Sequence, residues 1–89
     1  HVHIGNCVMR DPSHPAYGDE HPRFGVPGGE NDVEELAEFL SVLFDIGYLS
    51  TDGPKPVSFE VKPIAAYNET SETVIAASKR TLNKAWALV

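Results

Sequence analysis

Two histidines stand two residues apart in the first run of the chain, His1-Val2-His3-Ile4-Gly5. This run predicts a strand, and the alternation of side chains along a strand sends His1, His3 and Gly5 to one face. An imidazole at a strand end can bind a metal ion or transfer a proton. The alternative is a core histidine with satisfied hydrogen bonds beside a solvated N-terminal residue.

A carboxylate, Glu60, lies near the C-terminal end of a second predicted strand, between Phe59 and Val61. If it is buried, it must be paired, protonated or bound to a metal ion, because an isolated buried charge is very costly. Lys62 supplies the simpler alternative of a surface ion pair with Glu60. His3 and Glu60 are therefore candidates for one site only if the fold brings their strand ends together.

Hydrophobic periodicity and turn residues predict the elements that would position these side chains. In order, they are a strand over 1–8, a loop over 9–30, a helix over 33–46, a turn over 50–54, a strand over 56–61, a loop over 62–70 and a helix over about 71–88. Asn31 or Asp32 can cap the first helix, and Gly47 suits its C-terminal end. The predicted apolar stripes are Val33, Leu36, Ala37, Leu40, Leu43 and Phe44 in the first helix and Ile75, Leu82, Ala85, Trp86 and Val89 in the second.

The loop over 9–30 contains four prolines and four glycines, which exclude regular structure. Long connections of this kind are usually functional lids or disordered segments. Because Tyr17 and Phe24 are available to pack, we predict that this loop is a lid that covers an active site, and not a disordered segment.

Strands that alternate with helices predict an α/β fold with parallel strands covered by helices. Two such units cannot close a sheet and correspond to a quarter of an eight-unit barrel. The loops that follow the strands would then lie on the C-terminal face of the barrel, where active sites are built. His3 and Glu60 are expected to converge there from neighbouring strands.

Thirteen acidic and seven basic side chains give a net charge of −6 without a cluster of Lys or Arg. This disfavours nucleic-acid binding through phosphate contacts. No apolar run is long enough to cross a membrane, Cys7 has no cysteine partner, and no secretory signal pattern opens the chain, so we expect a cytoplasmic protein. The chain opens with His1 already inside a strand pattern, and we interpret it as part of a longer protein.

The chain resembles the xylose-isomerase-like TIM barrels, which include sugar-phosphate isomerases and ketose 3-epimerases. The resemblance is carried by the His1–Gly5 run, Val-Pro-Gly-Gly at 26–29, Asp-Ile-Gly-Tyr at 45–48 and Ser-Phe-Glu at 58–60. It implies that residues 1–89 are the C-terminal part of a single TIM-barrel domain, namely the seventh and eighth strand–helix units of a (β/α)8 barrel.

The resemblance also implies a chemistry. Members of the family bind one divalent ion, often Mn, Mg or Co, through Glu, Asp, His and Glu, so His3 and Glu60 would be the last two ligands. The first two would come from earlier strands outside this chain. Glu60 would also transfer protons beside the carbonyl of a sugar or sugar phosphate through an enediolate. His1 would lie one layer behind His3 as its support.

Ketose epimerases hold substrate oxygens with an arginine after the metal histidine, and here either Arg23 or Arg10 would take that place. Asp19 and His21 would hold the lid together or contact the sugar. Alternatively, they resemble the Asp-x-His zinc pair of apurinic-site endonucleases, which would make the protein an endonuclease IV-like zinc phosphodiesterase acting at abasic DNA. A third alternative is a non-catalytic barrel fragment.

The isolated segment is expected to be inactive and to need its missing neighbours or self-association in order to fold, because its two strands leave open edges.

Overall fold

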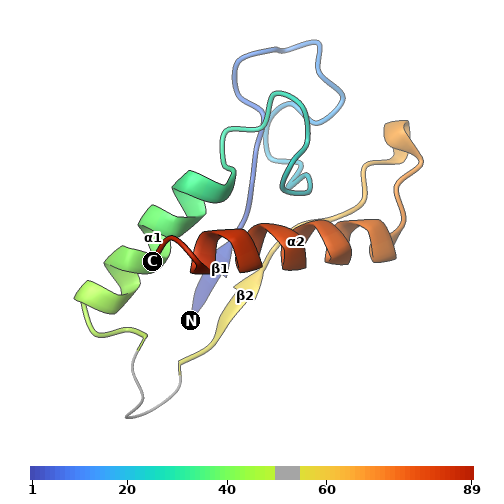
Figure 1. Cartoon of the computed structure of the whole chain (residues 1–89). Helices are drawn as coiled ribbons and strands as arrows, with labels where there is room; N and C mark the ends of the chain where they lie inside the picture. The colour runs from blue at the N-terminus through green and yellow to red at the C-terminus, as the bar shows by residue number, and fades with distance from the viewer. Residues whose placement is uncertain (50–54) are drawn as a thin grey trace.

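The computed structural model describes residues 1–49 and 55–89, so the turn predicted at 50–54 lies outside the described residues. The elements are strand β1 (Val2–Ile4), helix α1 (Val33–Asp45), strand β2 (Val57–Phe59), the 3-10 helix η1 (Ala65–Tyr67) and helix α2 (Ser71–Trp86). The two strands pair in parallel, which confirms a mixed α/β fold (Figure 1). No helix among the described residues is long and apolar enough to span a membrane.

The two strands are shorter than predicted, and the expected ranges of 1–8 and 56–61 are wrong in extent. After Ile4 the backbone of the first segment bonds to the returning loop instead of a strand. The carbonyl oxygen of Gly5 accepts from the side chain of Asn31 at 3.1 Å, and that of Cys7 accepts from the amide of Glu30 at 2.8 Å. A strand extends only as far as a neighbouring strand pairs with it, and here that pairing ends at Ile4 and Phe59.

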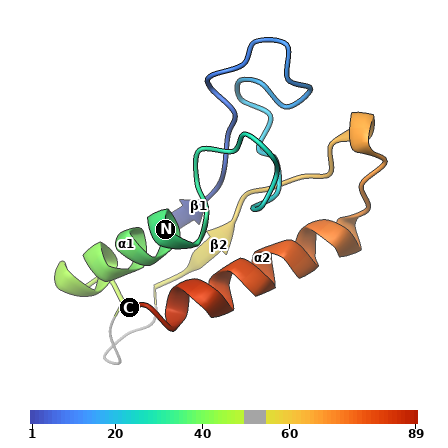
Figure 2. The ribbon, with the colours of Figure 1, turned by 45° about the horizontal axis from the view of Figure 1, so that its top comes forward.

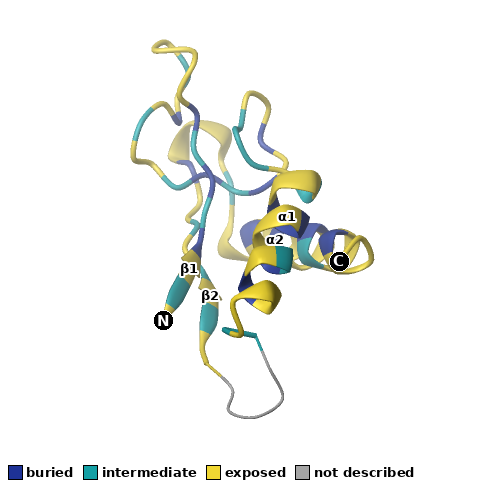
Figure 3. Cartoon of the chain, turned by 90° about the vertical axis from the view of Figure 1, so that its left-hand side faces the viewer, coloured by how far each residue is buried: buried dark blue, intermediate teal, exposed yellow. Residues whose placement is uncertain are grey.

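Both helices lie on the same side of the two-stranded sheet, as the views in Figures 2 and 3 show. Ile4 is buried in the core between the sheet and the helices, together with Leu36, Leu40 and Ala85. The ladder pairs Val2 with Val57, His3 with Ser58 and Ile4 with Phe59, so each pair shares one face of the sheet. The face opposite the helices therefore carries the polar side chains of both strands.

Helix α1 confirms its predicted limits closely. Asp32 is its N-cap, and the carboxylate of Glu35 accepts a hydrogen bond from the backbone N–H of Asp32 at 3.3 Å. Gly47 follows the helix with a φ of +79°, a conformation that glycine adopts at little cost. The buried stripe matches the prediction at Leu36, Ala37, Leu40 and Leu43, whereas Phe44 is exposed.

Helix α2 corrects the sequence interpretation. It ends at Trp86 instead of 88, and its buried face consists of Val74, Ala77, Ser78, Thr81 and Ala85. Of the predicted stripe, Ile75, Trp86 and Val89 are exposed. The two stripes have the same helical spacing, and small side chains occupy most of the buried one. Small residues let α2 approach its neighbours closely, which favours that face although larger apolar residues stand beside it.

The loop over 9–30 contains no helix or strand, as predicted, and it is packed. Phe24 is only 2% exposed within the main core, whereas Tyr17, expected to pack as well, is exposed. Isolated bridges join Val8 to Tyr17 and Gly18. A second small core lies beneath the loop and consists of Val8, Ala16, Val26 and Ile64.

A short turn opens this loop at Asp11, whose carboxylate accepts hydrogen bonds from the hydroxyl of Ser13 at 2.6 Å and from its backbone N–H at 3.0 Å. The side-chain bond first, and the backbone bond second, lower the pKa of Asp11 from its ordinary value of 3.8. A lowered folded pKa stabilises the turn above the unfolded pKa, and this contribution is lost as the pH falls through the folded pKa.

Ser13→Ala is therefore expected to raise the pKa of Asp11 toward 3.8, and an NMR titration of the Asp11 carboxyl carbon would measure the change. Ser13→Thr keeps the hydroxyl and is the matched control, with the pKa of Asp11 staying low. An equal pKa in the Ala and Thr variants would contradict the side-chain contribution.

Candidate functional site

The two residues predicted to converge are in contact. His3 belongs to β1, and Glu60 directly follows β2, where its amide donates to the carbonyl oxygen of Ile4 at 2.7 Å as part of the pairing of Ile4 with Phe59. The Nδ1 atom of His3 lies 2.7 Å from Oε2 of Glu60. Both side chains are about half exposed, at 54% and 50%. Such an exposed pair contributes little to the stability of the fold, so the fold does not depend on this contact.

His1 supports His3 on the same face of β1. The two imidazole rings meet edge to face, with centroids 4.7 Å apart and planes at 90°. The Nε2 atom of His1 also lies 3.3 Å from the hydroxyl of Ser58, the ladder partner of His3. These contacts bring His1 against His3, and its role as a support for that ring stays a prediction.

The loop over 9–30 places His21 beside Glu60 and Asp19 beside His21. Nδ1 of His21 lies 3.4 Å from Oε1 of Glu60, and Nε2 of His21 lies 2.8 Å from Oδ1 of Asp19. Lys62, the alternative partner of Glu60, instead pairs with Glu20 at 3.1 Å. We call the connected side chains of Asp19, His21, Glu60 and His3 the Glu60 network.

The two arginines lie in ion pairs outside this network. Nε of Arg23 lies 2.8 Å from Oε2 of Glu69, whose side chain is 5% exposed and whose other oxygen accepts from the amide of Ile64 at 2.9 Å. Arg10, largely exposed, pairs with Glu30 at 3.1 Å. The structure therefore does not join either arginine to His3 and Glu60, and their substrate contacts stay a prediction.

The donor atoms of His3 and Glu60 suit a divalent ion. Two ligands at right angles and about 2.1 Å from an ion are about 3 Å apart, close to the separation of this nitrogen and oxygen. Within residues 1–49 and 55–89, no three His, Cys, Asp or Glu side chains are grouped so that they could hold a metal ion. The described residues thus place two candidate ligands side by side, and a complete coordination shell would need others.

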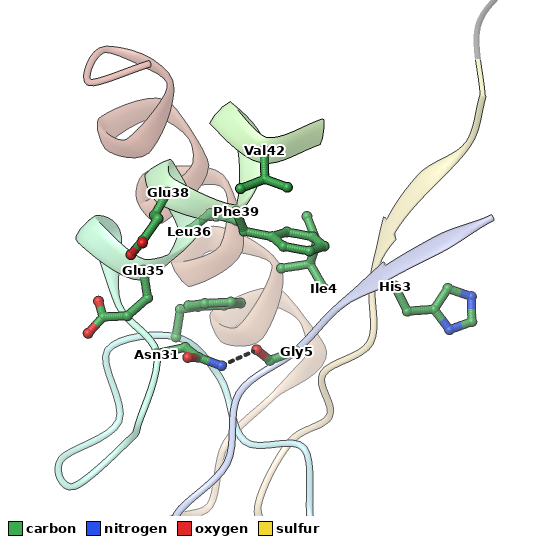
Figure 4. A pocket seen from close by; sticks show the side chains of 10 residues that line it. His3, Ile4, Gly5, Asn31, Glu35, Leu36, Glu38, Phe39 and Val42 are labelled. Carbon is green, nitrogen blue, oxygen red and sulfur yellow. Dashed lines mark hydrogen bonds between the residues drawn. The ribbon is translucent and has the colours of Figure 1, made fainter. Parts of the chain in front are cut away.

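A cavity of about 460 Å³ lies between β1 and α1 and is lined largely by apolar side chains, among them Ile4, Phe24, Leu36, Phe39 and Val42. Figure 4 shows that the imidazole of His3 points away from it, on the opposite side of β1 from Ile4. His3 thus also lines the cavity, but its imidazole lies on the other face of the sheet.

One residue that the sequence did not single out holds the site's loop in place. The buried side chain of Asn6 accepts hydrogen bonds at Oδ1 from the amides of Cys7 and Asn31, both at 2.9 Å. Its Nδ2 donates to the carbonyl oxygen of Arg23 at 3.1 Å. The sequence offered one signal for this role. Asn6 has a polar side chain inside a predicted strand, between Gly5 and Cys7, and such a side chain needs hydrogen-bond partners when it is buried.

Comparison with known proteins adds no further constraint: neither a family model, nor a curated protein, nor a solved structure matches the chain. The functional argument accordingly depends on the residues and on the geometry described above.

Proposed function

We propose that the chain is the C-terminal quarter of a (β/α)8 barrel that isomerises or epimerises a small sugar or sugar phosphate with one Mn, Mg or Co ion. The contact of His3 with Glu60 across two parallel strands is the observation that carries this proposal. A nitrogen and a carboxylate at adjacent strand ends are the ligand types that such an enzyme needs, on the face that the helices leave free.

The proposed roles follow from the positions of the side chains. Glu60 takes a proton from the carbon beside the sugar carbonyl, because a carboxylate is a competent acid–base group once it is fixed beside the reacting carbon. In an isomerisation Glu60 returns the proton to the neighbouring carbon, and in an epimerisation a second carboxylic acid, from an earlier strand outside this chain, returns one to the opposite face. The ion, when bound, supplies positive charge that stabilises the enediolate oxygens. His3 holds the ion beside Glu60, and His1 holds the ring of His3 in place.

The two outer flanks of the sheet support the barrel hypothesis. Beside β1, Phe39 and Val42 line one cavity, and beside β2, Ile75 and Leu82 line another of about 510 Å³. Phe39, Val42 and Ile75 are exposed here. Large apolar side chains on both flanks suit further strand–helix units on each side, or other copies when the segment is alone.

Metal analysis of the full-length protein tests the proposal. We expect one Mn, Mg or Co ion per chain and exchange of the ketose α-proton with solvent in the presence of that ion. Two or three zinc ions per chain, with cleavage of abasic DNA, would instead establish the zinc phosphodiesterase. The contacts of His21 with Asp19 and with Glu60 are the observation behind that second function, and the net charge of −6 opposes it. If the protein contains no metal ion and catalyses no exchange, the non-catalytic barrel fragment is the hypothesis that remains.

A further inference from the structure

The loop residue His21 is held in an uncommon backbone conformation. Its φ of +52° lies in the left-handed region, which non-glycine residues seldom adopt and which clusters at functional sites. The conformation is fixed from outside, since the carbonyl oxygen of His21 accepts from the amide of Lys62 at 2.8 Å. The neighbouring Glu20 adds an ion pair to the side chain of Lys62. The segment that carries His21 is therefore docked against the residues that follow β2.

Gly5, directly after β1, lies close to both residues. A Cβ atom built there would lie 3.2 Å from the carbonyl oxygen of Glu60 and 3.7 Å from Nδ1 of His21. Few side-chain carbons approach a backbone oxygen that closely, so a larger residue would push the two segments apart. Glycine at this position lets His21 and Glu60 meet beside β1.

Both ring nitrogens of His21 face carboxylates, Nε2 toward Asp19 and Nδ1 toward Glu60. A histidine that binds a sugar hydroxyl or an ion directly needs one of these nitrogens free. The arrangement instead matches a histidine that orients a catalytic carboxylate and is itself oriented by a second carboxylate.

We propose that Asp19 and His21 are positioning residues for Glu60. The Nδ1 atom of His21 lies 3.4 Å from Oε1, while His3 is hydrogen-bonded to Oε2, so imidazoles flank both oxygens of the carboxylate. Asp19 sets the orientation of the His21 ring. The inference rests on the proposed function for the task of Glu60, but the positioning itself is a property of the metal-free chain.

Carboxyl labelling of the full-length protein, freed of metal, tests this positioning, because the isolated segment is expected to need its neighbours in order to fold. Carbodiimide and glycine ethyl ester convert accessible carboxylates to amides, and peptide mass spectrometry gives the amidation rate at each residue. His21→Asn removes the imidazole and keeps a residue that tolerates the left-handed conformation. Asp19→Asn removes the orienting charge. We expect either change to raise the amidation rate of Glu60 about twofold to fivefold, the size of one exposed ionic contact.

Two controls separate positioning from a general loss of structure. Glu20→Gln removes a neighbouring carboxylate that pairs with Lys62, and it should leave the rate at Glu60 unchanged. Glu69, buried in its pair with Arg23, should stay slow to react in every variant. In the His21→Asn background, Asp19→Asn should add nothing, because its effect passes through the ring.

An unchanged rate at Glu60 in both single variants would overturn the positioning role. An equal rise in Glu20→Gln would also overturn it, because docking of the loop alone would then explain the effect. Neither result depends on metal or sugar. The proposed function is tested separately, by the metal content and the proton exchange of the full-length protein.

Discussion

Glu60→Gln is expected to lower the exchange of the ketose α-proton in the full-length protein by about 10²- to 10⁴-fold. A neutral amide has nearly the shape of the carboxylate but cannot take the proton, and it is a weaker ligand for a divalent ion. The exchange is followed by proton NMR in D2O, as loss of the signal from the hydrogen beside the carbonyl. Glu60 is half exposed and follows β2, so the substitution should leave the fold intact.

The matched control for this loss is Glu20→Gln, since Glu20 is a nearby carboxylate that pairs with Lys62 and not with His3 or His21. It should retain the exchange rate of the unaltered protein. Exchange that persists in Glu60→Gln at the original rate would remove Glu60 from the reaction and with it the isomerase proposal.

Asn6→Ala is expected to reduce the free energy of unfolding by about 2–4 kcal/mol. The substitution leaves the amides of Cys7 and Asn31 without their acceptor and the carbonyl oxygen of Arg23 without its donor. A polar group that is buried without a partner keeps the full cost of losing water. Urea unfolding followed by circular dichroism, at one protein concentration for all variants, measures the change.

Asn83→Ala is the control for this second prediction, because Asn83 is exposed on α2 and should change the stability by about 0.5 kcal/mol or less. If Asn6→Ala and Asn83→Ala unfold at the same midpoint urea concentration, the loop over 9–30 is held by its apolar contacts alone.

The sequence predicts the order of the elements, the parallel pairing and the meeting of His3 with Glu60. Those features follow from local periodicity and from the alternation of side chains along a strand. The length of β1 could not be predicted, because it depends on whether the backbone after Ile4 bonds to a strand or to the loop. The buried face of α2 could not be predicted either, because it consists mostly of small side chains, including the polar Ser78 and Thr81, while larger apolar residues such as Ile75 stand beside it.

Long-range partners explain the rest of the difference. Arg23 was one of two arginines that the family resemblance proposed for substrate binding, yet it bonds to Glu69, which lies 46 residues away. No local pattern marks such a pair. Asp19 and His21, by contrast, were singled out by their resemblance to a known Asp-x-His zinc pair, and the structure adds the contact of His21 with Glu60.

Because side chains alternate along β1, both the candidate site and the core depend on one register of this strand. His3 faces the polar side, and the adjacent Ile4 is buried against the helices. A slip of one residue would exchange the two, so an imidazole would enter the core and an isoleucine would replace it beside Glu60. Substitutions on the polar face can therefore vary the chemistry without repacking the core, whereas an insertion or deletion in β1 would damage both at once.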